Sequence, residues 1–166
     1  MNSLVILEKS GPIAAVTLNR PTRHNSLIPE LLNDLISVVE NLRGDAAVRV
    51  MILQANGKSF STGGDVRSFF DHRRAIETYS KQVVGPLNQA ILSFVTLPFP
   101  IVAAVHGLVT GGSIGLVLAS DVVLVAPEVT FTPYYATVGF SPDGGWTAML
   151  PALVGIRRTA EVLLLD

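Results

Sequence analysis

Residues 101–125 read IVAAVHGLVTGGSIGLVLASDVVLV, and Asp121 carries the only formal charge among them. A run this apolar is long enough to cross a membrane as a helix. However, four glycines fall within nine of these residues, and the opening Ile-Val-Ala-Ala-Val suits a buried strand. We therefore expect a strand, a glycine turn, a short helix and a second strand here, rather than a membrane span.

Strands and helices alternate along the rest of the chain, with short connections. Apolar residues recur at helical spacing after residue 28, and a Ser-Gly-Pro turn separates two strand-like runs near the start. This alternation predicts one α/β domain whose strands are mostly parallel. We expect strands at 4–9, 13–19, 48–53, 101–105 and 122–125, the last three buried, helices at 28–42, 83–95, 144–153 and 157–165, and a helix or loop at 67–81.

The composition restricts the class of protein. A chain of 166 residues fits one domain, and its 49% hydrophobic and 15% charged residues do not suit a disordered chain. A net charge of −1 provides no electrostatic attraction for nucleic acid or for a membrane surface. The absence of cysteine excludes disulfides, thiolate zinc sites and cysteine nucleophiles. An acidic residue lies too close to the start for a signal peptide, so we expect a cytoplasmic protein.

Two glycine turns carry the functional argument. Residues 60–65 read FSTGGD, and residues 106–113 read HGLVTGGS before an expected helix. Glycine lets the backbone approach a ligand closely and frees its N–H groups, and a helix N-terminus adds partial positive charge. Two converging N–H groups form an oxyanion hole, worth about 3–4 kcal/mol per donor. Each turn alone also suits plain strand–helix packing, and neither has the spacing of a phosphate or dinucleotide loop.

Taken together, the order and spacing of the motifs resemble the crotonase superfamily of enoyl-CoA hydratases and isomerases, from about residue 4 to residue 165. The matching segments are VTLNRP at 16–21 with Asn25, GKSFSTGGDV at 57–66, AVHG at 104–107, GG at 111–112, ASD at 119–121, GFSPDGG at 139–145, LP at 150–151 and VG at 154–155. The resemblance implies an α/β fold of the ClpP/crotonase type, a spiral of strand–strand–helix repeats. It further implies that residues 1–166 form an acyl-CoA-binding core that lacks the family's C-terminal trimerisation helices.

The resemblance also implies roles for single residues. The backbone N–H groups of Gly64 and Gly112 match the oxyanion donors. The substrate is an acyl-CoA thioester, so that coenzyme A arrives as part of the substrate and no separate cofactor or metal is required. Complete family members form homotrimers or hexamers, which implies the same assembly for the full-length protein.

The coenzyme A end of the substrate is implied to lie at the first glycine turn and the loop before it. Backbone groups of this turn hold the adenine end in the family, which points to Thr62, Asp65 and Val66. A basic residue after Asn-Arg-Pro often meets the phosphates, which points to Arg23. The alternative for Arg23 is a solvated loop charge.

The chain departs from the hydratase pattern at its catalytic carboxylates. Gly115 and Tyr135 occupy the two positions at which hydratases of the family carry glutamates, and activation of water together with proton delivery requires both carboxylates. Asp143 instead matches an acid that moves the proton in certain isomerases and serves as the nucleophile in a dehalogenase branch. A structural alternative is that Asp143 caps the helix expected from residue 144.

Phe140, Trp146 and Tyr135 are expected around the acyl group, where apolar surroundings would raise the pKa of Asp143. We therefore expect an isomerase-like enzyme in which Asp143 transfers a proton. Two alternatives stay open: a thioester hydrolase or dehalogenase with Asp143 as nucleophile, and a truncated chain without catalysis. His106 is expected to be structural, because it lies between a buried strand and a glycine.

Overall fold

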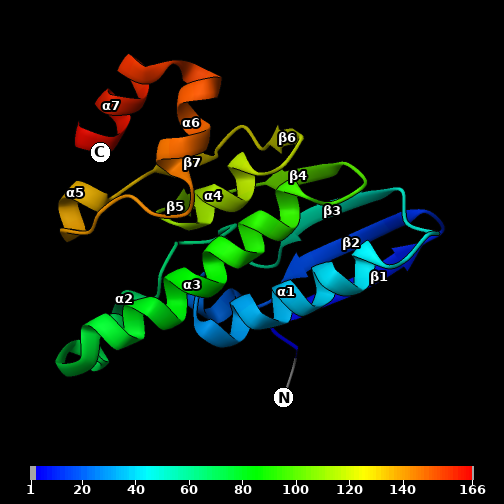
Figure 1. Cartoon of the computed structure of the whole chain (residues 1–166), viewed down its shortest axis with the longest axis horizontal. Coiled ribbons are helices and arrows are strands. Elements are labelled where there is room, and N and C mark those ends of the chain that lie inside the picture. Colours follow the sequence, from blue (N-terminus) through cyan, green and yellow to red (C-terminus); the bar gives the residue numbers. More distant parts are fainter. Residues whose placement is uncertain (1–2, 166) are drawn as a thin grey trace.

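A five-stranded sheet with the order β1-β2-β3-β4-β6 forms the centre of the computed structural model, which describes residues 3–165 (Figure 1). Residues 1–2 and 166 of the expected domain lie outside the described part. The strands of this sheet are β1 Val5–Ser10, β2 Ile13–Leu18, β3 Val50–Ala55, β4 Ile101–Val105 and β6 Val122–Val125. A separate two-stranded sheet pairs β5 Leu108–Thr110 with β7 Thr130–Thr132.

The strand directions agree with the expected α/β class. The hairpin of β1 and β2 is antiparallel, with Ser10 opposite Ile13 at the turn. The pairs β2–β3, β3–β4 and β4–β6 are all parallel. Parallel neighbours bring their carboxyl ends to the same edge of the sheet, and this edge carries both glycine turns.

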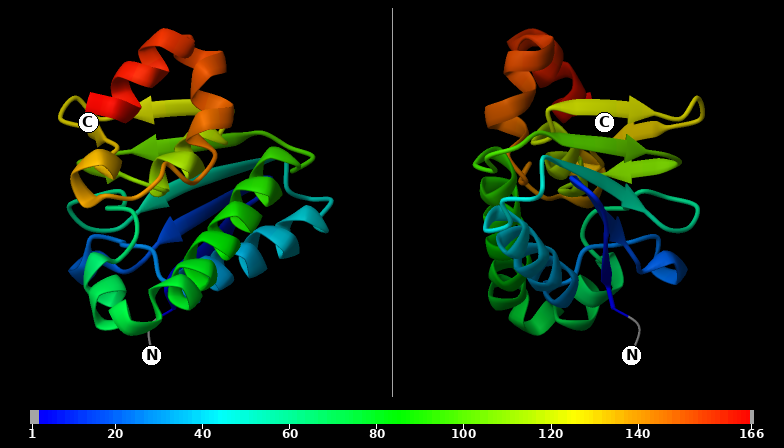
Figure 2. Two further views of the ribbon diagram at one scale, coloured as in Figure 1. Left: turned by 60° about the vertical axis from the view of Figure 1, so that its left-hand side comes forward. Right: turned by 90° about the vertical axis from the view of Figure 1, so that its right-hand side faces the viewer.

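Two long helices cover one face of the sheet, as both views in Figure 2 show. They are α1 Pro29–Arg43 and α3 Ile76–Val95, and they pack against each other. The shorter elements are η1 Pro21–Arg23, α2 Val66–Asp71, η2 Arg73–Ala75, α4 Ser113–Leu118, α5 Tyr135–Val138, α6 Trp146–Val154 and α7 Ile156–Leu165. Across residues 3–165, no helix combines the length and hydropathy that a membrane span requires.

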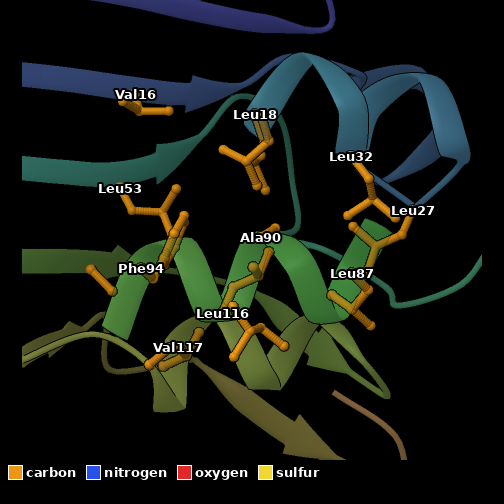
Figure 3. Packing of buried hydrophobic residues seen from close by; sticks show 14 of the residues in the cluster. Val16, Leu18, Leu27, Leu32, Leu53, Leu87, Ala90, Phe94, Leu116 and Val117 are labelled. Carbon is orange, nitrogen blue, oxygen red and sulfur yellow. The ribbon is translucent and has the colours of Figure 1, made fainter. Parts of the chain in front are cut away.

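The core fills the space between the sheet and these helices. Leu87, Ala90 and Phe94 on α3 lie between the strands and α4, whose Leu116 and Val117 meet them from the other side (Figure 3). Apolar residues at this spacing place one face of α3 toward the core. Because α3 touches both α1 and α4, it fixes the position of the second glycine turn relative to the sheet.

Some expectations about burial and extent were wrong. In β3 and β4 buried residues alternate with half-buried ones, so these strands are not buried on both faces. Every residue of β6 is exposed, and β6 is an edge strand of the sheet that pairs only with β4. Helix α3 begins seven residues before the expected start at residue 83. The sequence did not indicate β5, β7 or α5, which are only three or four residues long.

Candidate active site

The two glycine turns lie against each other at the carboxyl edge of the sheet. The N–H of Phe60 donates to the carbonyl oxygen of His106 over 3.0 Å, and the N–H of Thr110 donates to that of Ser61 over 3.1 Å. Ser61 also forms a parallel bridge with Val109 of β5, so the first turn pairs with the strand inside the second one. The turns are therefore held side by side by main-chain hydrogen bonds, whatever side chains they carry.

Gly63 shows why the first turn requires glycine. Its φ is +69°, in the left-handed region, and a Cβ there would lie 2.7 Å from the carbonyl oxygen of Thr110. Any other residue would be strained and would push the two turns apart. Close contact between the turns thus depends on the missing side chain.

Gly64 and Gly112 line the same cavity, which has a volume of about 130 Å³. The hydrogen bonds of residues 3–165 include none donated by the N–H of either glycine, so both groups are available to a ligand. Asp143 is the only residue with a formal charge in the described lining. The lining residues are Leu27, Thr62, Gly63, Gly64, Val66, Phe69, Val83, Leu87, Thr110, Gly111, Gly112, Pro133, Tyr134, Tyr135, Val138, Phe140 and Asp143.

The Asp143 carboxylate lies directly beside Gly112, the second of the two glycines expected as oxyanion donors. A Cβ on Gly112 would be 2.9 Å from Oδ1 of Asp143 and 2.6 Å from Cδ2 of Leu87. Asp143 does not cap a helix: α6 begins at Trp146, Gly145 is its N-cap residue, and no side chain caps it. The capping alternative was therefore wrong, and the carboxylate is turned into the cavity.

Tyr135 is the hydrogen-bond partner of this carboxylate. Its hydroxyl donates to Oδ1 of Asp143 over 2.5 Å. Burial raises the pKa of Asp143 above that of an ordinary carboxyl, although the hydrogen bond from Tyr135 acts in the opposite direction. Burial, and then the charge of Asp143, raise the pKa of Tyr135 above its usual range, so the hydroxyl keeps its proton.

Of the three residues expected around the acyl group, Tyr135 and Phe140 line the cavity and Trp146 does not. Phe140 packs against Phe69 with ring centroids 5.4 Å apart. Trp146 lies behind Tyr135, in an edge-to-face contact at 5.9 Å. Its indole Nε1 donates to the carbonyl oxygen of Gly111 over 3.0 Å. This hydrogen bond holds the Trp146 ring against the second glycine turn, outside the lining of the cavity.

Position 115, one of the two positions at which the resemblance implies a glutamate in hydratases, has no room for a side chain. A Cβ on Gly115 would lie 2.8 Å from Cδ1 of Ile91 and would overlap the backbone of the loop that carries Asp143. Tyr135 fills the second glutamate position with an uncharged hydroxyl. The site thus contains one carboxylate rather than two.

The four residues expected to contact coenzyme A lie together. Arg23, Thr62, Asp65 and Val66 line an open groove of about 400 Å³. This groove adjoins the cavity, because Thr62, Gly64 and Val66 line both. A polar groove and an apolar cavity therefore meet at the first glycine turn.

Asp65 has a structural role within this groove. Its buried carboxylate forms ion pairs with Arg20 at 2.9 Å and Arg23 at 3.1 Å, and it accepts hydrogen bonds from the Ser26 hydroxyl and the Ser68 N–H. Burial acts to raise the pKa of Asp65, but the hydrogen bonds outweigh burial and lower the pKa to about 2. Asp65 thereby caps α2 and joins it to the loop after β2.

Sequence reasoning missed Arg67, which lines the same groove from the first turn of α2. Within the described part of the chain it forms no ion pair, whereas the guanidinium of Arg23 is committed to Asp65. The only indication in the sequence was its position two residues after the Gly-Gly-Asp motif. His106 is half-buried, and its Nε2 bonds to the carbonyl oxygen of Gly57 over 2.9 Å, which fits the expected structural role.

The sequence matches one protein family and several of its curated members. The profile of the enoyl-CoA hydratase/isomerase family matches residues 8–166. The chain is 34% identical to a "Probable enoyl-CoA hydratase" of Rhodobacter capsulatus, over 95% of this chain and 59% of the relative. It is 26% identical to a trans-2-decenoyl-[acyl-carrier-protein] isomerase of Streptococcus mutans, over 96% and 61%. It is 27% identical to a 4-chlorobenzoyl coenzyme A dehalogenase of an Arthrobacter species, over 96% and 58%.

Solved structures with a similar fold come from the same family. The crystal structure of an enoyl-CoA hydratase from Bacillus halodurans superposes with a TM-score of 0.93 at 26% identity, covering 99% of this chain and 66% of that one. The chain spans about three-fifths of the length of the curated relatives it matches. The described architecture is therefore the crotonase fold, and the chain belongs to the enoyl-CoA hydratase/isomerase family.

Proposed function

We propose that the complete protein isomerises enoyl-CoA thioesters, with Asp143 as the group that moves the proton. The observation that carries this proposal is the single buried carboxylate placed beside Gly112 in an otherwise uncharged cavity. Gly64 and Gly112 supply two free N–H donors in the same cavity. These are the parts that formation of a thioester enolate requires.

The proposed reaction moves a double bond from the 3 to the 2 position of the acyl chain. Asp143 removes a proton from the carbon next to the thioester carbonyl. The electron pair of the broken C–H bond passes to the carbonyl oxygen, where the N–H groups of Gly64 and Gly112 stabilise the enolate. Asp143 then returns the proton two carbons along the chain, so that no proton is gained or lost.

The environment of Asp143 suits this role. A base works best when its pKa lies near the pH at which the enzyme operates, and burial moves the pKa of Asp143 in that direction. Apolar walls such as Leu87 and Phe69 lower the polarity of the cavity, which strengthens the attraction between the enolate oxygen and its donors.

Hydration is not favoured by this site. Adding water across a double bond requires one group to activate the water and another to deliver a proton. Position 115 cannot accept a side chain without displacing the loop that carries Asp143, and position 135 holds a tyrosine. Asp143 alone serves a shuttle, in which one group removes and returns the same proton.

Coenzyme A is proposed to bind in the groove that adjoins the cavity. The thioester would then lie near Gly64, between the apolar cavity for the acyl chain and the polar groove for the nucleotide. Arg67 and Arg23 place cations beside this groove, as phosphate binding requires.

A second candidate is nucleophilic attack by Asp143, supported by the 27% identity to the Arthrobacter dehalogenase. In that case the Asp143 carboxylate would displace halide from a carbon of the acyl group and form an ester that water then hydrolyses, or it would activate water to attack the thioester carbonyl and release coenzyme A. Both reactions require the ionised carboxylate, so the raised pKa of Asp143 is compatible with either one.

The test is the Asp143→Asn variant of the complete protein. Asn keeps the shape of the side chain and an oxygen for Tyr135, but it removes the base. We expect conversion of 3-enoyl-CoA to 2-enoyl-CoA, and deuterium exchange next to the carbonyl, to fall by at least about a hundredfold. Calorimetric binding of a saturated acyl-CoA should stay the same, because Gly64 and Gly112 donate from the backbone.

Two results would reject the isomerase assignment. One is an Asn variant that retains its isomerisation rate. The other is a wild-type protein that hydrates 2-enoyl-CoA as fast as it isomerises 3-enoyl-CoA. A covalent acyl adduct on Asp143, detected by mass spectrometry of the quenched reaction, would favour the nucleophilic candidate instead.

The complete protein is also proposed to assemble as a homotrimer or a hexamer. The exposed apolar side chains of β6 and of α6 and α7 support this, because surfaces of this kind often mark contacts between subunits. Light scattering of the complete protein over a range of concentrations tests it, and a stable monomer at high concentration would contradict it.

A further inference from the structure

The hydroxyl of Tyr135 lies near two oxygen atoms of Asp143, and its short hydrogen bond goes to the carboxylate oxygen. It lies 2.5 Å from the carboxylate Oδ1 and 3.4 Å from the carbonyl oxygen of the same residue. A carboxylate only accepts hydrogen bonds, so the phenol is the donor. A short bond to a charged acceptor is stronger than a neutral one, and it fixes the orientation of the carboxylate.

Tyr135 is itself held in place by the second glycine turn. It is buried, with 4% of its surface exposed, and its ring contacts the edge of Trp146. The Trp146 indole in turn donates to the carbonyl oxygen of Gly111. A chain of contacts therefore runs from the residue before Gly112, through Trp146 and Tyr135, to the carboxylate of Asp143.

We propose that Tyr135 is a positioning residue that holds Asp143 through Oδ1 and leaves Oδ2 as the oxygen that exchanges the proton with the substrate. This inference rests on the proposed function and adds a second residue to it. Because the chain of contacts starts beside Gly112, the base and the oxyanion donor keep a fixed relation to each other.

The hydrogen bond serves both halves of the reaction. When Oδ2 takes the proton, a C–H bond breaks and an O–H bond forms, while the Tyr135 hydroxyl still donates to Oδ1. When the proton leaves Oδ2 for the carbon two positions along the acyl chain, the hydrogen bond from Tyr135 stabilises the carboxylate that forms. No group has to rotate between the two steps, which keeps the site preorganised.

The surroundings leave Tyr135 as the main polar influence on Asp143. Among the described residues that line the cavity, from α2, α3, α5 and the two glycine turns, Asp143 is the only charged group. Tyr134 and Tyr135 are the only other titratable ones in this lining, and α6, which packs behind Tyr135, contains no charged residue. Helix α7, which packs against α5, carries Arg157, Arg158 and Glu161, but none of the three lines the cavity, and Arg158 is paired with Glu161. A change in the protonation of Asp143 can thus be attributed to Tyr135.

The test compares the pH profiles of kcat/KM for isomerisation by the wild type and by Tyr135→Phe in the complete protein. Phe keeps the ring packed against Trp146 and removes only the donor. Loss of a donor to the anion makes Asp143 easier to protonate, so the acid limb of the profile should move to higher pH by about one unit. On the plateau, kcat should fall about tenfold with little change in KM, because the carboxylate is free to rotate.

Tyr79→Phe is the matched control, since Tyr79 is a buried tyrosine on α3 that packs against Phe69 and lies outside the lining of the cavity. Its acid limb should coincide with that of the wild type. If Tyr135→Phe does not fold, fluorotyrosine at position 135 replaces it. The more acidic phenol donates a stronger hydrogen bond, so the limb should then move to lower pH.

The outcomes separate this inference from the proposed function. An acid limb that stays in place in Tyr135→Phe or in the fluorotyrosine protein, while Asp143→Asn is inactive, overturns the role of Tyr135 alone. An active Asp143→Asn overturns the proposed function and the inference with it. A limb that moves in the stated direction, with the Tyr79→Phe limb unchanged, supports both.

Discussion

Gly115 and Gly144 are in backbone contact, so close that a Cβ on Gly115 would overlap the carbonyl oxygen of Gly144. Gly144 is equally close to a second residue of this region, because a Cβ on Gly144 would lie 2.8 Å from the carbonyl oxygen of Gly112. The loop that carries Asp143 is therefore seated on the first turn of α4. In this chain, the absence of a side chain at position 115 is what allows Asp143 to reach the cavity.

Gly115→Ala should destabilise the complete protein by at least about 2 kcal/mol, because the added methyl group meets backbone that cannot rotate away. Urea denaturation followed by circular dichroism measures this. The control is Gly44→Ala at the end of α1, where φ is −82° and the nearest atom to a Cβ is 3.9 Å away. That variant should stay within about 0.5 kcal/mol of the wild type. Equal stabilities for the two variants would show that the Gly115–Gly144 contact is loose.

Asp65→Asn should lower the free energy of unfolding at neutral pH by about 2–3 kcal/mol. Removing the charge leaves Arg20 and Arg23 without their anion, and the cost lies below that of a fully buried pair because Arg23 is partly exposed. Thermal denaturation at pH 7 provides the measurement. Glu77→Gln, which breaks the exposed pair with Lys81, is the control and should leave the melting temperature unchanged.

The same variant has a defined pH dependence. The pKa of Asp65 falls from 3.8 to about 2 on folding. A lowered pKa contributes stability that is fully present above the unfolded value and is lost as the pH falls through the folded one. The difference between wild type and Asp65→Asn should thus be constant above about pH 5 and shrink as the pH approaches 2. A difference that persists unchanged in acid would mean that the charge of Asp65 is not its cause.

Arg67→Ala should weaken binding of free coenzyme A more than Arg23→Ala does, by about tenfold against about threefold. Arg67 is free of carboxylates in the described structure, whereas Arg23 is already paired with Asp65. Isothermal titration at two salt concentrations checks the charge dependence, since binding to phosphates weakens as salt rises. If Arg23→Ala lost more affinity for coenzyme A than Arg67→Ala, the phosphates would lie on the η1 side of the groove.

The sequence predicted the α/β class, the hairpin, the main helices and the two glycine turns, because each has a strong local pattern. The paired glycines at 63–64 and 111–112 are examples, because each pair follows an apolar, strand-like run in the sequence. Burial was harder to predict. An apolar strand such as β6 resembles an interior strand in composition, and only the strand order shows that it lies at the edge.

The sequence identified most residues of the candidate site, but it predicted few of the contacts between them. Asp143 was identified, but its bond to Tyr135 joins residues eight positions apart through a turn whose geometry no periodicity reveals. Trp146 was expected in the cavity because it is aromatic and near Asp143, yet its indole N–H required an acceptor and found Gly111. The expected contact of Asp65 with coenzyme A stays a prediction, and the sequence did not indicate its ion pairs with Arg20 and Arg23.

Asp143→Asn should be more stable than the wild type at neutral pH, by about 1 kcal/mol, although it is the variant expected to lose activity. The reason is the direction of the pKa shift: burial raises the pKa of Asp143 in the folded state, opposite to the shift of Asp65. For a raised carboxyl pKa the folded state binds more protons than the unfolded state, so stability is lost as the pH rises from the unfolded value through the folded one. The gain from Asp143→Asn should therefore be absent below about pH 4, grow as the pH rises, and level off once the folded carboxyl is fully ionised. Urea unfolding of both proteins at a series of pH values measures the difference directly. A variant that is less stable than the wild type across this range would show that the charged carboxylate, held by Tyr135, stabilises the fold, and the cost of burying a base would then not apply to this site.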